Sequence, residues 1–210
     1  MSKTLLYLLD IRIDGHRAKT GLKEVIDMIN GYFKHSPLHN EDKPTMTAIH
    51  KFKITGEPRV IIVLETLRGE AVLEMVTSWL FTLSGCNFTC TPLTDYEVFA
   101  KDVLGVDADL CKPSPRKLNR KYTYWNDLTI DYHGMTWEDF KQLWAKEAST
   151  VLRLRCESDA SIDLFKIKNC RKVSFIKALK IYKNATCLKY HLNPKVNYLN
   201  CFLPHCYFKM

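Results

Sequence analysis

Apolar and polar positions in the first half of the chain follow the two periods of regular secondary structure. Residues 3–13 begin as an apolar run and then alternate, which predicts a β-strand. Apolar residues recur every three or four positions over 22–33, which predicts an amphipathic helix that Thr20 can cap. Residues 45–55 and 59–67 alternate on either side of a Gly-Glu-Pro turn, and together they predict a β-hairpin.

A second helix and a fourth strand complete this first unit. The helix begins at Gly69 and ends at Gly85, residues 87–94 form the strand, and a short helix or extension follows over 95–104. The order strand–helix–strand–strand–helix–strand is that of the ferredoxin-like split βαβ unit. We therefore predict an α+β fold class, with a ferredoxin-like unit over residues 1–105 whose two helices cover one face of an antiparallel sheet.

The opening pattern recurs 115 residues further along the chain. A linker over 106–121 carries Pro-Ser-Pro and basic residues, and an aromatic, alternating stretch follows it. Thr136 then begins a helix as the first residue of a capping box, with an apolar stripe of Trp137, Phe140, Leu143 and Trp144. A full second copy would run to about residue 220. We predict that this copy is incomplete and limited to residues 122–155.

The composition changes after Arg155. Residues 1–155 hold 21 Lys and Arg against 20 Asp and Glu, whereas residues 156–210 hold 10 against 3, five of the eight cysteines and no glycine. A segment without glycine has few ways to form tight turns. We predict that 156–210 is an irregular basic tail, disordered or non-native read-through, with at most helical turns over 172–183. A basic amphipathic arm for membranes or partner helices is the alternative.

Several function classes have no support in the sequence. The first apolar run is broken by Asp10 and Arg12 before it could span a bilayer, and no disulfide framework is present, so a cytoplasmic protein with reduced thiols is expected. No P-loop, dinucleotide fold, Ser-His-Asp arrangement or zinc finger is visible, and no cofactor or metal is expected. Cys86 and Cys90 lack the second pair of ligands that a zinc site needs.

Two further patterns leave alternatives open. Asp127, Asp131 and His133 alternate on one predicted strand and could hold a metal, although no further segment supplies ligands. Tyr122 and Tyr124 beside the basic linker could stack on the bases of single-stranded nucleic acid. The first unit has no aromatic pair on its exposed face, so nucleic acid is not the expected partner.

A tandem of two ferredoxin-like units resembles the dimeric α+β barrel superfamily, which includes muconolactone-isomerase-like proteins, cofactor-independent monooxygenases and haem-degrading enzymes. The resemblance covers residues 3–104 as a topology and 122–154 as a fragment. It implies an isomerase- or monooxygenase-like enzyme, or a binding protein, that takes an apolar or aromatic small molecule. Because a fold does not define a function, a non-catalytic interaction module remains the alternative, with a homodimer through the open sheet face.

Strand alternation predicts which charged residues line that open face. They are Asp10, Arg12, Lys51 and Glu65. Asp10 or Glu65 could accept a proton, and Arg12 or Lys51 could stabilise a developing anion. The same alternation places His50 on the helix-covered face as a core residue.

Overall fold

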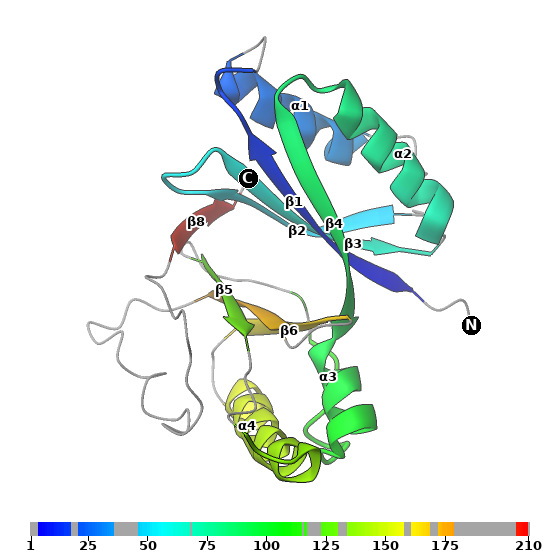
Figure 1. Cartoon of the computed structure of the whole chain (residues 1–210), viewed down its shortest axis with the longest axis vertical. Helices are drawn as coiled ribbons and strands as arrows, with labels where there is room; N and C mark the ends of the chain where they lie inside the picture. The colour runs from blue at the N-terminus through cyan, green and yellow to red at the C-terminus, as the bar shows by residue number, and fades with distance from the viewer. Residues whose placement is uncertain are drawn as a thin grey trace. The chain divides into compact units, whose positions relative to one another are not determined.

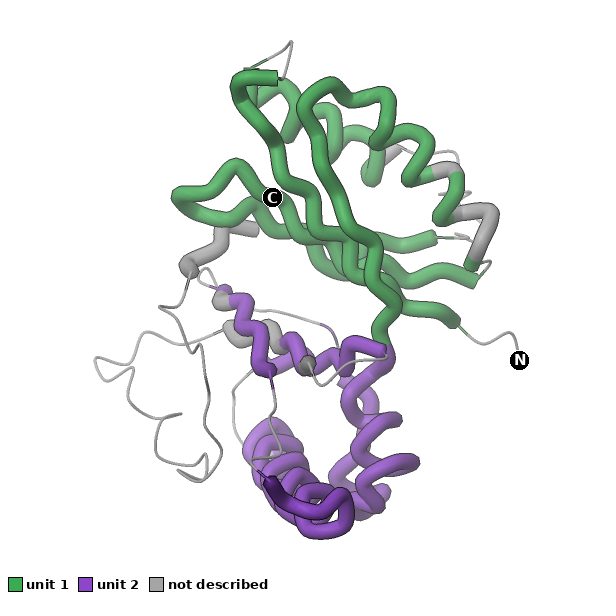
Figure 2. Tube along the Cα trace, in the orientation of Figure 1, with its two compact units in different colours: residues 1–93, 207–210 green, residues 94–206 purple. Residues whose placement is uncertain are grey.

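The computed structural model describes ten segments of the chain, namely residues 4–17, 21–35, 46–67, 69–114, 116, 123–129, 134–157, 161–168, 172–178 and 205–209. They form two compact units (Figure 2). Unit 1 comprises residues 1–93 with 207–210, and unit 2 comprises residues 94–206. The boundary therefore lies within a strand and not in the predicted linker.

Unit 1 has the element order that the sequence predicts. The elements are β1 (Leu5–Ile13), α1 (Leu22–His35), β2 (Met46–Ile54), β3 (Arg59–Thr66), α2 (Gly69–Thr82) and β4 (Cys86–Asp95). β1 pairs with β4 and β3, and β3 pairs with β2, all antiparallel. A strand from the far end of the sequence, β8 (His205–Lys209), pairs antiparallel with the other edge of β2. The predicted α+β, ferredoxin-like fold is confirmed.

Both helices of unit 1 cover the same face of this sheet (Figure 1). The ring of Tyr32 on α1 stacks on Trp79 of α2, with 3.9 Å between ring centroids. Burial of the apolar residues on this face is the main source of stability of the unit. The core comprises Leu9, Ile11 and Ile13 of β1, Val60, Ile62 and Leu64 of β3, Val25, Ile29 and Phe33 of α1, and Val76 and Leu80 of α2.

A β-bulge in β2 reverses the faces of its second half. Ala48 pairs with Leu64 and His50 with Val63, so the register shifts by one residue between them. One extra residue moves every later side chain to the opposite face. His50 therefore lies on the face away from the helices, stacked on Phe52 at 5.8 Å between centroids, and its predicted placement on the helix-covered face is wrong.

Unit 2 continues further than the sequence predicts. After α3 (Tyr96–Phe99) and the π-helical turn η1 (Ala100–Leu104), it contains β5 (Thr123–Thr129), α4 (Trp137–Glu157), β6 (Ser161–Ile167) and β7 (Lys172–Ala178). β7 pairs antiparallel with both β5 and β6, as β3 does with β1 and β2. The second copy thus has its hairpin.

The prediction that the second copy is limited to residues 122–155 is therefore wrong. The helical turns expected over 172–178 are wrong as well, because these residues form β7, and residues 179–183 lie outside the described residues. The physical reason is that a lack of glycine limits which turns can form, whereas apolar residues at alternate positions suffice for strands. The read-through origin of 156–210 stays a prediction.

The second core uses the segment directly after β4. Tyr96, Ala100 and Leu104 pack with Phe140 and Trp144 of α4 against the sheet residues Ile162, Leu164 and Val173. α3 and η1 thus occupy the position that a second helix has in unit 1. This is why the predicted first domain, 1–105, ends too late. Thr136 caps the helix as predicted, since the Asp139 N–H donates to Thr136 Oγ1 at 3.2 Å, although Trp137 of the predicted stripe is exposed.

Candidate functional site

Asp10, the first predicted site residue, is engaged by an arginine of the neighbouring strand. Arg59 donates from Nε to Asp10 Oδ1 and from Nη2 to Oδ2, each at 2.8 Å. Both carboxylate oxygens are thereby hydrogen-bonded in a bidentate pair. This geometry holds Asp10 as a structural anion and does not present it to take a proton from a ligand.

The other predicted residues lie on two different faces. The pairing of β1 with β3 places Arg12 and Glu65 on the face away from the helices. Arg12 is exposed there and Glu65 is half-buried. Lys51 lies opposite Ile62, on the helix-covered face, and its Nζ donates to Asn30 Oδ1 of α1 at 2.7 Å. Burial, and then the neighbouring Lys34, lower the pKa of Lys51. The bulge in β2 thus removes Lys51 from the predicted cavity face.

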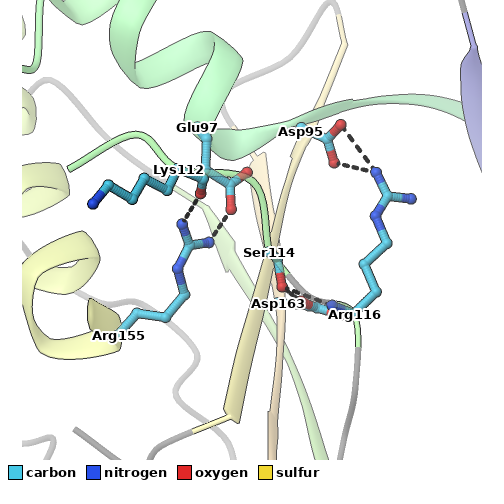
Figure 3. A network of polar contacts seen from close by, with 7 residues as sticks. All are labelled: Asp95, Glu97, Lys112, Ser114, Arg116, Arg155 and Asp163. Atoms are coloured by element: carbon cyan, nitrogen blue, oxygen red, sulfur yellow. Dashed lines mark hydrogen bonds and ion pairs between the residues drawn. The ribbon is translucent and has the colours of Figure 1, made fainter. Parts of the chain in front are cut away.

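A network of buried charges holds unit 2 together (Figure 3). Arg155 near the end of α4 forms an ion pair with Glu97 of α3, and it also donates to the carbonyl oxygen of Lys112 at 2.6 Å. The two side chains of the pair are 7 % and 5 % exposed. Burial lowers the pKa of Arg155. This pair fixes α3 against α4.

A second set of contacts connects the same region to β6. Arg116 donates to both carboxylate oxygens of Asp95, at 2.9 and 3.1 Å, and Ser114 donates to the buried Asp163 of β6. Three residues of the predicted linker therefore connect the end of β4, α4 and β6, namely Lys112, Ser114 and Arg116. No local sequence pattern predicts these contacts, because the partners lie 21 to 58 residues apart.

A cavity of about 280 Å³ opens in unit 2 between the helical segment formed by α3 and η1 and the end of β6. Its apolar wall consists of Val98, Phe99 and Val103. Thr94, Asp102, Lys166 and Lys168 supply the polar groups. Two of the lining residues, Asp102 and Val103, belong to the π-helical turn η1. Turns of this kind occur frequently at functional sites.

Lys166 gives the cavity a buried positive charge. The residue is 8 % exposed, and its Nζ donates to the carbonyl oxygen of Ile167 at 2.6 Å. The same Nζ lies 5.5 Å from the ring centroid of Phe99 and 6.0 Å from that of Trp144. Aromatic faces attract cations, so these rings help to keep the ammonium group inside the protein. Sequence reasoning missed Lys166 because it was counted with the basic tail.

The cavity does not fit a metal or haem. Within the described segments, no three His, Cys, Asp or Glu side chains gather to bind a metal ion. Haem iron is held by His, Cys, Met or Tyr, and none of these is among the described residues that line the cavity. Between 94 and 178 the described residues include no histidine. The Tyr96 hydroxyl accepts a hydrogen bond from Trp144, and burial raises the pKa of Tyr96, so it stays protonated.

Comparison with known proteins gives a result for structure alone. No family model matches the sequence, and no curated protein matches it. The chlorite dismutase from Candidatus Nitrospira defluvii in complex with imidazole matches with a TM-score of 0.58 over 99 % of this chain and 91 % of that one, at 7 % identity. Two mutants of that enzyme also match with TM-scores of 0.58, at 8 % and 9 % identity, over 100 % and 94 % of this chain and 92 % and 85 % of theirs.

The chain has the chlorite dismutase fold. This fold belongs to the dimeric α+β barrel group, so the predicted resemblance is confirmed at the level of the fold. The match extends beyond residue 155, in agreement with the β6–β7 hairpin that the structure shows. At this level of identity the likeness carries no assignment of residues or reaction. No described helix has the length and apolar character to cross a membrane.

Proposed function

We propose that this protein binds a small apolar or aromatic compound, as a member of the dimeric α+β barrel group of proteins. The observation that carries the proposal is the cavity of unit 2, which Val98, Phe99 and Val103 line together with the buried ammonium group of Lys166. Small-molecule sites typically combine an apolar lining with a few placed polar groups. The chlorite dismutase of similar fold is described in complex with imidazole, which is itself a small aromatic ring.

Binding is favoured over isomerase-like or monooxygenase-like proton transfer. Of the two candidate bases in unit 1, Asp10 has both oxygens bound to Arg59, which leaves Glu65 as the other candidate. A second candidate surface for ligand contact consists of Asp10, Arg12, Arg59 and Glu65. It differs from the predicted set because it includes Arg59 and excludes Lys51, which lies on the helix-covered face. The free thiols of Cys86, Cys90, Cys111 and Cys156 support the proposal of a reducing, cytoplasmic environment.

Self-association is the second candidate function. Phe81 of α2 is 79 % exposed, with its ring centroid 5.0 Å from that of the half-buried Phe88, and an exposed aromatic side chain favours protein contacts. The apolar residues of the sheet face that was predicted to form a homodimer, Leu6, Ile61 and Val63, are buried. Sedimentation velocity of the wild type and of Phe81→Ser decides this candidate: a dimer that the substitution dissociates supports it, and a monomeric wild type refutes it.

The binding proposal is tested by filling the cavity. Val103→Trp adds a large side chain to the lining, and Leu67→Trp in unit 1 is a matched control, since the two residues are 41 % and 40 % exposed. Single-ring aromatic compounds are titrated into the protein and followed by NMR chemical shifts. Binding to the wild type and to Leu67→Trp, with loss in Val103→Trp, is expected. The absence of binding to the wild type, or equal binding to Val103→Trp, contradicts the proposal.

A further inference from the structure

We infer that the ligand of the unit 2 cavity is a small carboxylate with a single apolar ring or a short aliphatic body, and that Lys166 recognises its anionic group. This inference rests on the proposed function and specifies the class of compound. It follows from the size of the cavity, from the charges that line it and from the arrangement of its apolar and polar walls.

The cavity is small. Its volume of about 280 Å³ falls just below the range of roughly 300–1,000 Å³ that holds drug-sized ligands. A nucleotide would extend beyond the lining residues. A compound with one six-membered ring or a few methylene groups matches the available space.

The charge of the lining favours an anion. Among the described lining residues there are two lysines, Lys166 and Lys168, and one carboxylate, that of Asp102. The two lysines differ in exposure, because Lys168 lies at the surface whereas Lys166 is buried. The ammonium group of Lys166 is therefore screened less by water than that of Lys168, and it acts more strongly on a bound anion.

The position of Lys166 is fixed before any ligand arrives. Its Nζ is held by the carbonyl oxygen of Ile167 and by the rings of Phe99 and Trp144. Binding then costs little side-chain entropy, which is the advantage of a preorganised site. Phe99 also lines the cavity, so one ring contacts both the ammonium group and the body of the ligand.

The apolar wall distinguishes a carboxylate from a phosphate. Phosphate groups are bound by arginine forks, by lysine and by backbone N–H groups at helix N-termini. The described lining has lysine but no arginine, and it adds the hydroxyl of Thr94 and three apolar side chains. A monoanionic carboxylate accepts hydrogen bonds from lysine and threonine, and its hydrocarbon part packs on Val98, Phe99 and Val103.

The test compares benzoate with benzamide, which has nearly the same shape without the charge. Binding to the wild type is measured by NMR titration, and the Nζ resonance of Lys166 reports directly on the site. A hydrogen bond to a charged group predicts that benzoate binds about tenfold more tightly than benzamide or better, and that benzoate shifts the Lys166 signal. Equal affinities, or an unshifted Lys166 signal, overturn the inference.

Variants then assign the selectivity to one residue. Lys166→Met is expected to reduce benzoate affinity to that of benzamide, whereas Lys101→Met, an exposed lysine of η1 outside the lining, is expected to keep the preference. If Lys166→Met does not fold, the wild-type preference and the Lys166 signal decide alone. Benzamide that binds as well as benzoate overturns the inference and leaves the proposed function intact. If neither compound binds, the inference fails, and the proposed function fails only if every other single-ring compound also fails to bind.

Discussion

Replacing Arg155 with methionine should destabilise unit 2 strongly. Arg155 and Glu97 form a buried ion pair, with side chains 7 % and 5 % exposed, and Arg155 also donates to the carbonyl oxygen of Lys112. Removal of one partner leaves the other charge buried and uncompensated, which costs about 3–5 kcal/mol. The lost hydrogen bond to Lys112 adds about 1 kcal/mol. We expect the free energy of unfolding to fall by about 4–6 kcal/mol.

Urea denaturation followed by tryptophan fluorescence measures this loss. Three of the four tryptophans, Trp125, Trp137 and Trp144, belong to unit 2, and only Trp79 belongs to unit 1. With a dependence of about 2 kcal/mol per molar urea, the transition midpoint should fall by roughly 2–3 M. Circular dichroism of the same samples shows whether unit 1 unfolds in the same transition.

The double variant Glu97→Gln, Arg155→Met isolates the cause. If the cost arises from an unpaired buried charge, neutralising Glu97 should recover at least half of the lost stability, because neither side chain is then ionised. A loss below about 1 kcal/mol in Arg155→Met would refute the reasoning, since an exposed pair contributes only that much. A double variant as unstable as the sum of the two single variants would refute it as well.

Three further predictions concern other parts of the chain. Maleimide should modify the exposed Cys156 at pH 8 well before Cys90, because burial raises the pKa of Cys90 to about 11, and peptide mass spectrometry would show the reverse order if this is wrong. Asp10→Asn should cost unit 1 about 1 kcal/mol in a urea titration at low salt and less at high salt, and a cost that does not depend on salt would argue against a role of charge. Deletion of residues 158–210 should unfold unit 2, since β6 and β7 supply part of its core, and a protease-resistant unit 2 in the shortened chain would contradict this.

The fold of unit 1 could be predicted because its signals are local. Alternation over β1 and β3 and a three-to-four spacing over α1 identify both the elements and their buried faces. The faces of β2 could not be predicted in the same way. Its bulge between Ala48 and His50 is set by pairing with β3, and nothing in the sequence of β2 marks the inserted residue.

Composition and periodicity indicate different structures for the second half of unit 2. Apolar residues at Ile162 and Leu164 alternate as a strand requires, yet the basic, glycine-free context suggested an irregular tail. The cavity was missed for a different reason. Phe99 and Lys166 lie far apart in the sequence and belong to different elements, so only the three-dimensional arrangement shows that they meet.

The pairing of β8 with β2 has a consequence for synthesis on the ribosome. β2 ends at Ile54, whereas the strand that covers its edge begins at His205. At about 5–20 residues per second, the nascent chain carries an uncovered strand edge for roughly 8–30 s. Such an edge can pair with a neighbouring polypeptide on the same messenger. Lys51 and Lys53, two cations on this edge strand, would oppose that misassembly while translation proceeds.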